Sequence, residues 1–265
     1  MLLSAVSNRT LSNSRADYCK LSRVLTKARE LGEVPFDWIV DRSRPTYSAS
    51  AFDDLADGLR ALRDQYRRDY WQDQPYHVEV WCEKDAVVGS IQPVTDKLGV
   101  AIHVCRGFTS TPRAHEIAER YLRVAKPIYV FYLGDHDPSG REIEHDICRR
   151  VQGDRPSGWF TLTRLAIHER DIGYFRLPPL RVKESDSRAA RFKHLYGTGC
   201  VELDALPSEE LRSRVRQAIE RRIEGEAWGR AMAIERAEQE NITRFVGRWT
   251  DPRRQTEARP EGSDP

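Results

Sequence analysis

The sequence predicts an α/β fold with a mostly parallel sheet and helices at both ends of the chain. Between residues 77 and 206, short segments rich in β-branched and aromatic residues alternate with segments whose apolar residues recur every three or four positions. One short segment, Ile128–Leu133 (IYVFYL), is apolar throughout, which is typical of a central strand covered on both faces. Strands that alternate with helices favour parallel pairing, because a parallel return needs a crossover connection.

The first 76 residues predict a small helical module. Apolar residues at helical spacing predict a helix over residues 17–31, which Gly32 ends, and a second helix from Phe52 to Tyr66. Arg42 and Arg44 lie in the polar segment between the two helices.

The central part predicts four strands with helices between them. Pro93 is expected to kink or divide the helix that follows the first strand, because proline removes a backbone donor and crowds the preceding turn. Thr111-Pro112 is a helix start. The predicted strands are, in chain order, Val78–Cys82, Val100–Cys105, Ile128–Leu133 and Phe160–Leu165.

The last part of the chain is predicted to be helical up to about residue 248. Residues 249–265 are rich in Pro, Arg, Glu, Ser and Asp without periodicity, so we expect a disordered tail. The expected divisions are therefore residues 1–76, 77–206, 207–248 and 249–265.

Bulk composition says little about partners but bounds the class of protein. The 43 basic and 41 acidic residues among 265 leave a net charge of +2, so any basic surface must be local. Five cysteines without a Cys-x-x-Cys motif indicate reduced thiols rather than a disulfide scaffold. The start MLLSAVSNRT lacks a basic segment, and no long apolar stretch occurs, so we expect neither a signal peptide nor a membrane span, and a cytoplasmic location.

Acidic residues follow two of the predicted strands. Asp135 and Asp137 come directly after Ile128–Leu133, and Glu83 ends the strand Val78–Cys82. In a parallel sheet these strand ends meet at one edge, and grouped carboxylates with open positions suit Mg²⁺ bound to a substrate phosphate. The alternative for Asp137-Pro138 alone is a helix cap followed by proline in the first turn.

The pattern resembles the Toprim fold, a Rossmann-like domain of topoisomerases, primases and some nucleases. The residues that carry the resemblance are a strand-end glutamate, Glu83, and the segment Asp135-His136-Asp137-Pro138-Ser139-Gly140. The longer form of this segment, together with residues 80–86 (VWCEKDA) and 201–207 (VELDALP), is similar to the A subunit of type IIB topoisomerases and its stand-alone bacterial and phage relatives. The resemblance implies that Glu83, Asp135 and Asp137 hold Mg²⁺ and are catalytic. It assigns no role to Glu202 and Asp204, which we otherwise expect to cap the helix near Pro207.

The same resemblance implies DNA as the substrate and suggests partners. Double-stranded DNA, a homodimer and a separate ATPase subunit are the expected partners, with a nucleoid-associated location. The sequence contains no Gly-x-x-x-x-Gly-Lys-Ser/Thr loop, so the chain alone is not expected to be a P-loop ATPase. The residues expected to contact DNA beside the metal are Lys84, Arg106, Arg113, Arg42 and Arg44.

The chain departs from that family in its nucleophile. The A subunits cleave DNA with a tyrosine on a winged-helix domain that precedes the Toprim domain, and residues 1–76 resemble only part of that domain. Residues 1–14 contain no tyrosine, and Tyr18 matches a later, non-nucleophilic position. We therefore expect either a chain truncated at its N-terminus or one that has lost the tyrosine. Three hypotheses follow: a topoisomerase-like A subunit, a nuclease that uses a metal-bound water, and a degenerate protein that only binds DNA.

Overall fold

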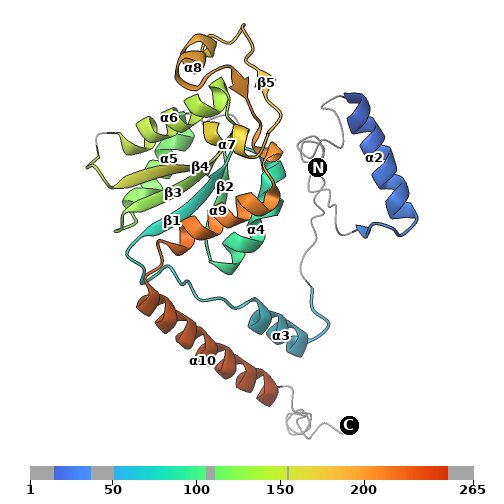
Figure 1. Ribbon diagram of the computed structural model, residues 1–265. Helices are drawn as coiled ribbons and strands as arrows, with labels where there is room; N and C mark the ends of the chain where they lie inside the picture. Colours follow the sequence, from blue (N-terminus) through green and yellow to red (C-terminus); the bar gives the residue numbers. More distant parts are fainter. Residues whose placement is uncertain (1–14, 37–50, 106–110, 154, 250–265) are drawn as a thin grey trace, which may run out of the picture. The chain divides into compact units, whose positions relative to one another are not determined.

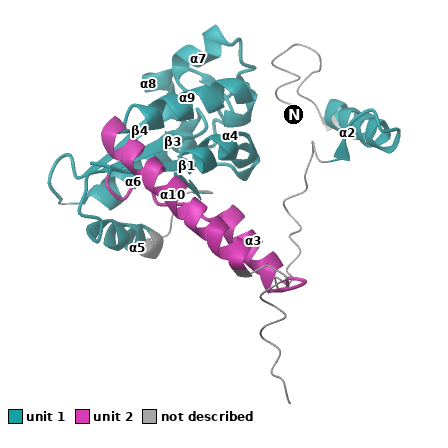
Figure 2. Ribbon diagram, turned by 90° about the horizontal axis from the view of Figure 1, so that it is seen from below, with its two compact units in different colours: residues 1–39, 74–223 teal, residues 40–73, 224–265 magenta. Residues whose placement is uncertain are grey.

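The computed structural model describes residues 15–36, 51–105, 111–153 and 155–249. The chain forms two compact units, one of residues 1–39 and 74–223 and the other of residues 40–73 and 224–265 (Figure 2). The elements are α2 (Arg15–Glu30), α3 (Leu55–Gln65), β1 (His77–Cys82), α4 (Asp85–Lys97), β2 (Ala101–Val104), α5 (Thr111–Leu122), β3 (Ile128–Leu133), α6 (Pro138–Gln152), β4 (Phe160–Ala166), α7 (Glu169–Tyr174), β5 (Leu180–Arg181), α8 (Ala189–Tyr196), β6 (Gly199–Cys200), the 3₁₀ helix η2 (Leu203–Ala205), α9 (Ser208–Glu220) and α10 (Gly225–Trp249).

The larger unit contains a four-stranded sheet in the order β2-β1-β3-β4, and every pair of neighbouring strands is parallel (Figure 1). The predicted α/β class with a mostly parallel sheet is therefore confirmed. The apolar segment Ile128–Leu133 is β3, and its place between β1 and β4 explains why it is almost entirely buried. The sequence did not predict the short antiparallel pair of β5 and β6.

Helices cover both faces of this sheet (Figure 1). On one side α4 packs against α9, and on the other α5 packs against α6. Trp81, Tyr121 and Tyr132 are fully buried between the strands and the α5–α6 layer, where the aliphatic side chains of α6 complete the core. Burial of aromatic and aliphatic side chains on both faces supplies the main stabilisation of such a sheet.

The strand order reverses between β1 and β3. From β1 the chain passes through α4 to β2 on one side, whereas β3 lies on the other side of β1 and leads through α6 to β4. Because α4 and α6 belong to opposite layers, the connections after β1 and β3 diverge at the carboxyl ends of these two strands. Ligands of open α/β sheets bind where the strand order reverses in this way.

The register aligns the ends of the two strands. His77 pairs with Ile128 at one end and Cys82 with Leu133 at the other, so the chain leaves β1 and β3 at the same level. The backbone N–H of Glu83 donates to the carbonyl of Leu133 at 2.9 Å, which extends the pairing to the edge itself. The residues that follow the two strands therefore start side by side.

Pro93 was expected to kink or divide its helix; it does not divide it, because α4 runs from Asp85 to Lys97 with Pro93 inside it, and the kink stays a prediction. Burial of Val87, Ile91 and Val94 holds both halves of α4 in one helix.

The smaller unit is built on α3 and α10. The Tyr66 hydroxyl donates to Glu238 at 2.6 Å, and Arg68 forms an ion pair of 3.0 Å with the same carboxylate. The rings of Trp71 and Trp228 meet edge to face at 5.8 Å. Polar and aromatic contacts therefore join two segments that are distant in the sequence.

Other expectations are tested only in part. The two helices expected in the first 76 residues are present as α2 and α3, and the helical segments expected after residue 206 are α9 and α10. Residues 1–14, 37–50 and the expected tail from residue 250 lie outside the described residues, and the expected domain boundaries stay predictions. Within the described ranges no helix is both long and apolar enough to cross a bilayer.

Candidate metal centre

Glu83 follows β1 and turns toward the end of β3. Its Oε2 accepts hydrogen bonds from the backbone N–H of Asp135 at 3.0 Å and from the Tyr132 hydroxyl at 3.4 Å. Burial raises the pKa of Glu83, and the nearby charge of Asp137 adds to this rise, while the Asp135 N–H opposes it. The other oxygen, Oε1, has no hydrogen bond within the described part of the chain.

Asp135 lies at the end of β3 and is 7% exposed. Its Oδ1 accepts a hydrogen bond of 2.7 Å from the backbone N–H of Leu203, which lies 68 residues further along the chain. Burial raises the pKa of Asp135 to about 6; the Leu203 N–H opposes the rise and the charge of Glu83 adds to it. Glu83 and Asp135 therefore lie close together at the ends of neighbouring strands, as expected.

Asp137 begins α6. Its Oδ1 accepts the backbone N–H of Gly140 at 2.7 Å, and Pro138 occupies the first turn, so the expected helix cap is present. This role uses one carboxylate oxygen, and the other has no hydrogen bond among the described residues. Capping and metal binding are therefore compatible at Asp137.

Gly140 allows the first turn of α6 to press against both other acids. A Cβ atom at this position would lie 2.4 Å from the carbonyl oxygen of Asp135 and 3.1 Å from Oε2 of Glu83. Only glycine fits without moving backbone atoms, which gives a physical reason for the glycine in Asp-x-Asp-Pro-x-Gly.

Lys84 places a cation among the acids. Its Nζ lies 3.2 Å from Oδ2 of Asp135, 3.3 Å from Glu202 and 3.4 Å from Asp204. Burial alone would lower the pKa of Lys84, but these three carboxylates raise it above its ordinary value. The expectation that Glu202 and Asp204 cap the next helix was wrong, because α9 begins after Pro207 without a side-chain cap.

Arg164 on β4 binds residues 134–140, which we call the acidic loop, and the sequence did not predict this role. Its side chain is 3% exposed, and it donates to the carbonyls of Gly134 at 2.8 Å, Asp135 at 3.2 Å and Gly140 at 3.0 Å. Its Nε also pairs with Glu144 of α6 at 2.7 Å. A guanidinium with this many acceptors fixes the backbone that carries Asp135 and Asp137. The available signal was a single charged residue within a strand of apolar residues and threonines.

His136 is buried against α8. Its backbone pairs with Val201, and its ring meets Phe192 of α8 edge to face at 5.3 Å. Its Nδ1 lies 3.1 Å from Arg141, which can only donate, so the geometry assigns the proton to Nε2, an atom without a partner among the described residues. Burial lowers the pKa of His136 to about 4, so the ring is neutral.

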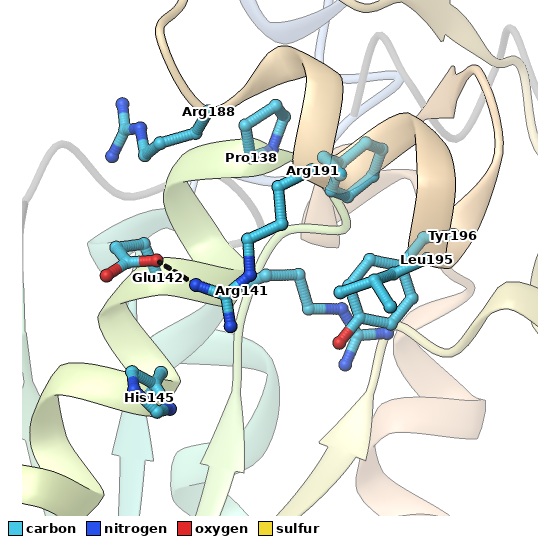
Figure 3. A pocket seen from close by; sticks show the side chains of 9 residues that line it. Pro138, Arg141, Glu142, His145, Arg188, Arg191, Leu195 and Tyr196 are labelled. Atoms are coloured by element: carbon cyan, nitrogen blue, oxygen red, sulfur yellow. Dashed lines mark ion pairs between the residues drawn. The ribbon is translucent and has the colours of Figure 1, made fainter.

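A small cavity of about 100 Å³ adjoins this loop between α6 and α8 (Figure 3). Its guanidinium groups already have partners: Arg191 lies 3.9 Å from Glu142, Arg188 donates to Ser139 and pairs with Asp186, and Arg141 stacks on Tyr196. The cavity therefore offers little unpaired charge to a ligand.

The donor set fits a hard divalent cation. Glu83 and Asp137 each present one oxygen without a protein hydrogen bond, while backbone N–H groups orient their other oxygens. The free oxygen of Asp135 faces Lys84 instead. In the described ranges, no group of three or more His, Cys, Asp or Glu side chains could hold a metal as it stands. Because the Lys84 ammonium contacts this oxygen of Asp135, a metal bound by all three acids would compete with that ion pair.

The expected DNA contacts are mostly untested. Arg42, Arg44 and Arg106 lie outside the described residues, and Arg113 belongs to α5 but its side chain is not described. Lys84 is described, and its ammonium is held by acids. No family model, no curated protein and no solved structure matches this chain.

Proposed function

We propose that this chain is a Mg²⁺-dependent DNA-binding protein of the type IIB topoisomerase A-subunit class, that it acts in strand cleavage, and that residues 77–206 are a Toprim domain. The observation that carries the proposal is the meeting of Glu83 and Asp135 at the point where the strand order reverses, with Asp137 opening α6 beside them. Sites of open α/β sheets form at such points.

The acids would divide the work. Asp135 and Asp137 would hold Mg²⁺ together with Glu83, and the bound ion would supply positive charge to a phosphate during attack. Glu83 is suited to take the proton of the attacking hydroxyl, because burial raises its pKa toward the range in which proton transfer is efficient. Arg164 and Gly140 would keep the three carboxylates in place.

The identity of the attacking group distinguishes two versions of this proposal. Tyr132 contacts Glu83, but its side chain is fully buried and burial raises the pKa of its phenol, so it is poorly placed to attack DNA. That observation favours the second candidate, a nuclease in which water attacks the phosphate. Tyr18 on α2 is 57% exposed and remains the tyrosine to test for a covalent route.

Further parts of the proposal follow from the resemblance alone. Residues 1–76 would form part of a winged-helix domain that binds duplex DNA, and the protein would act as a homodimer near the nucleoid, with a separate ATPase subunit. A degenerate copy that binds DNA without cleaving it is the third candidate.

The test is denaturing electrophoresis of labelled duplex DNA after incubation with the protein and Mg²⁺ or Mn²⁺. We expect cut DNA without a protein adduct from the wild type and none from Asp135→Ala/Asp137→Ala. Asp146→Ala is the control, because Asp146 lies more than two turns further along α6 and pairs with Arg149.

Other products would point elsewhere. A slow, protease-sensitive band that Tyr18→Phe abolishes would establish the covalent route. DNA binding without either product, at all metal concentrations, would contradict an enzymatic function of this chain.

A further inference from the structure

A second feature of the larger unit is a groove between α7 and α9, beside the end of β4. It encloses about 730 Å³ and opens to solvent. Arg164 forms part of its wall, and the same side chain donates to the carbonyls of Gly134 and Asp135. The groove therefore borders the acidic loop without including its carboxylates.

The charge of this α7–α9 groove is positive once its internal pairs are taken into account. Arg214 binds both oxygens of Asp171, at 2.7 and 2.9 Å, and also Glu210 at 2.7 Å, so one arginine offsets part of the charge of these two acids and one negative charge remains. Arg170 and Arg221 are exposed, and their guanidinium groups form no ion pair or hydrogen bond among the described residues, so their two positive charges exceed the one negative charge left on the acids. Two unpaired guanidinium groups thus remain, and guanidinium binds phosphate in a bidentate manner.

An exposed aromatic ring stands beside these cations. Tyr174 at the end of α7 is 80% exposed, more than any other large apolar side chain in the described part of the chain. Phe175 meets its ring edge to face at 4.7 Å, which supports the ring. A basic groove with an aromatic platform is the arrangement by which proteins hold single-stranded nucleic acid.

We propose that the α7–α9 groove binds a single-stranded DNA segment, with Arg170 and Arg221 on its phosphates and Tyr174 stacked on a base. The proposal rests on the proposed function in one respect, namely that DNA is the substrate.

The experiment is fluorescence anisotropy of a labelled oligothymidine in EDTA, which removes any contribution of divalent metal. We expect Arg221→Glu to weaken binding about tenfold and to lower the salt dependence by about one phosphate contact, a change of roughly 0.7 in the slope of log K against log salt. Arg170→Glu should act in the same way. Arg216→Glu is the matched control: it makes the same charge change on α9, the helix that Arg221 follows directly, but Arg216 does not line the groove.

Tyr174 tests the stacking half of the proposal. Tyr174→Ala should weaken binding by roughly five- to a hundredfold, the range of one base–aromatic contact, whereas Tyr174→Phe should bind like the wild type. Equal losses from Arg216→Glu and Arg221→Glu would overturn the proposal. So would unchanged affinity in Tyr174→Ala, or a preference for blunt duplex over the single strand.

The outcome is separable from that of the proposed function. Binding through the groove in EDTA without any cleavage in Mg²⁺ would leave the groove assignment standing and contradict the enzyme. Cleavage that depends on Asp135 and Asp137 but is unchanged in the groove variants would support the enzymatic function and contradict the groove assignment. Circular dichroism of each variant checks that these exposed substitutions leave the fold intact.

Discussion

At the scale of single residues, the central feature is the ammonium group of Lys84, which contacts Asp135, one of the expected metal ligands. Lys84 contacts Asp135, Glu202 and Asp204, and its side chain is 27% exposed. The ammonium neutralises Asp135 while no divalent ion is bound. Metal binding at Asp135 must therefore compete with this ion pair.

This competition gives a prediction for Lys84→Met. The variant should bind Mg²⁺ or Mn²⁺ several-fold more tightly than the wild type, because about 1 kcal/mol of ion-pairing with Asp135 no longer has to be lost. Isothermal titration calorimetry would measure the change. Lys97→Met is the control, since Lys97 is an exposed lysine in the last turn of α4, the helix that Lys84 precedes. An unchanged or weaker affinity in Lys84→Met would contradict the competition.

At the scale of elements, β4 supports a loop to which it contributes no acid. Arg164 reaches from β4 to the carbonyls of Gly134, Asp135 and Gly140 and to Glu144 on α6. Removing the guanidinium leaves Glu144, which is only partly buried, with the 3.4 Å contact from Arg141 alone, and takes a donor from three backbone carbonyls, of which that of Gly134 keeps the N–H of Ile167. The loss of several buried hydrogen bonds to a charged group is large.

We therefore expect Arg164→Met to lower the free energy of unfolding by about 3–5 kcal/mol, as measured by urea denaturation. Arg149→Met should cost less than about 1 kcal/mol, because the side chain of Arg149 is 64% exposed and its ion pair with Asp146 is at the surface. Similar costs for the two substitutions would show that Arg164 does not hold the loop.

Local patterns predicted the elements well, and tertiary contacts explain where they did not. The continuous apolar run of Ile128–Leu133 gave the central strand, and Asp137-Pro138 gave the start of α6, because both signals are local. The continuity of α4 through Pro93 depends on burial against other elements. The hydrogen bond between Leu203 and Asp135 spans 68 residues, and no local pattern indicates it.

At the scale of the whole molecule, the larger unit contains a buried charge apart from the acidic loop. The carboxylate of Glu79 on β1 is 4% exposed on its side chain. The groups that contact it are His77, Trp81, His103, Arg120 and Tyr121. Burial by itself would raise the pKa of Glu79, but the hydrogen bonds from the two histidines and Tyr121 lower it well below its ordinary value.

Because the pKa of Glu79 is lower in the folded state than in the unfolded state, the free energy of unfolding depends on pH. The contribution of Glu79 should be fully present above about pH 4.5, where the unfolded carboxyl is ionised, and should be lost as the pH falls further. Glu79→Gln should melt at a lower temperature at pH 7 and lose less stability between pH 5 and pH 3 than the wild type. Glu209→Gln, at a side chain that is 75% exposed, is the control for a thermal melting series. Parallel pH curves for wild type and Glu79→Gln would contradict this role.

The most direct test of the account is a calorimetric titration of Mg²⁺ and Mn²⁺ into the wild type and into Asp135→Ala/Asp137→Ala. We expect weak binding by the wild type without DNA, because Mg²⁺ keeps much of its hydration and uses substrate phosphate as a ligand. We expect no binding by the double variant, and wild-type binding by Asp146→Ala. Equal binding by the wild type and the double variant would contradict the claim that these carboxylates form a metal site.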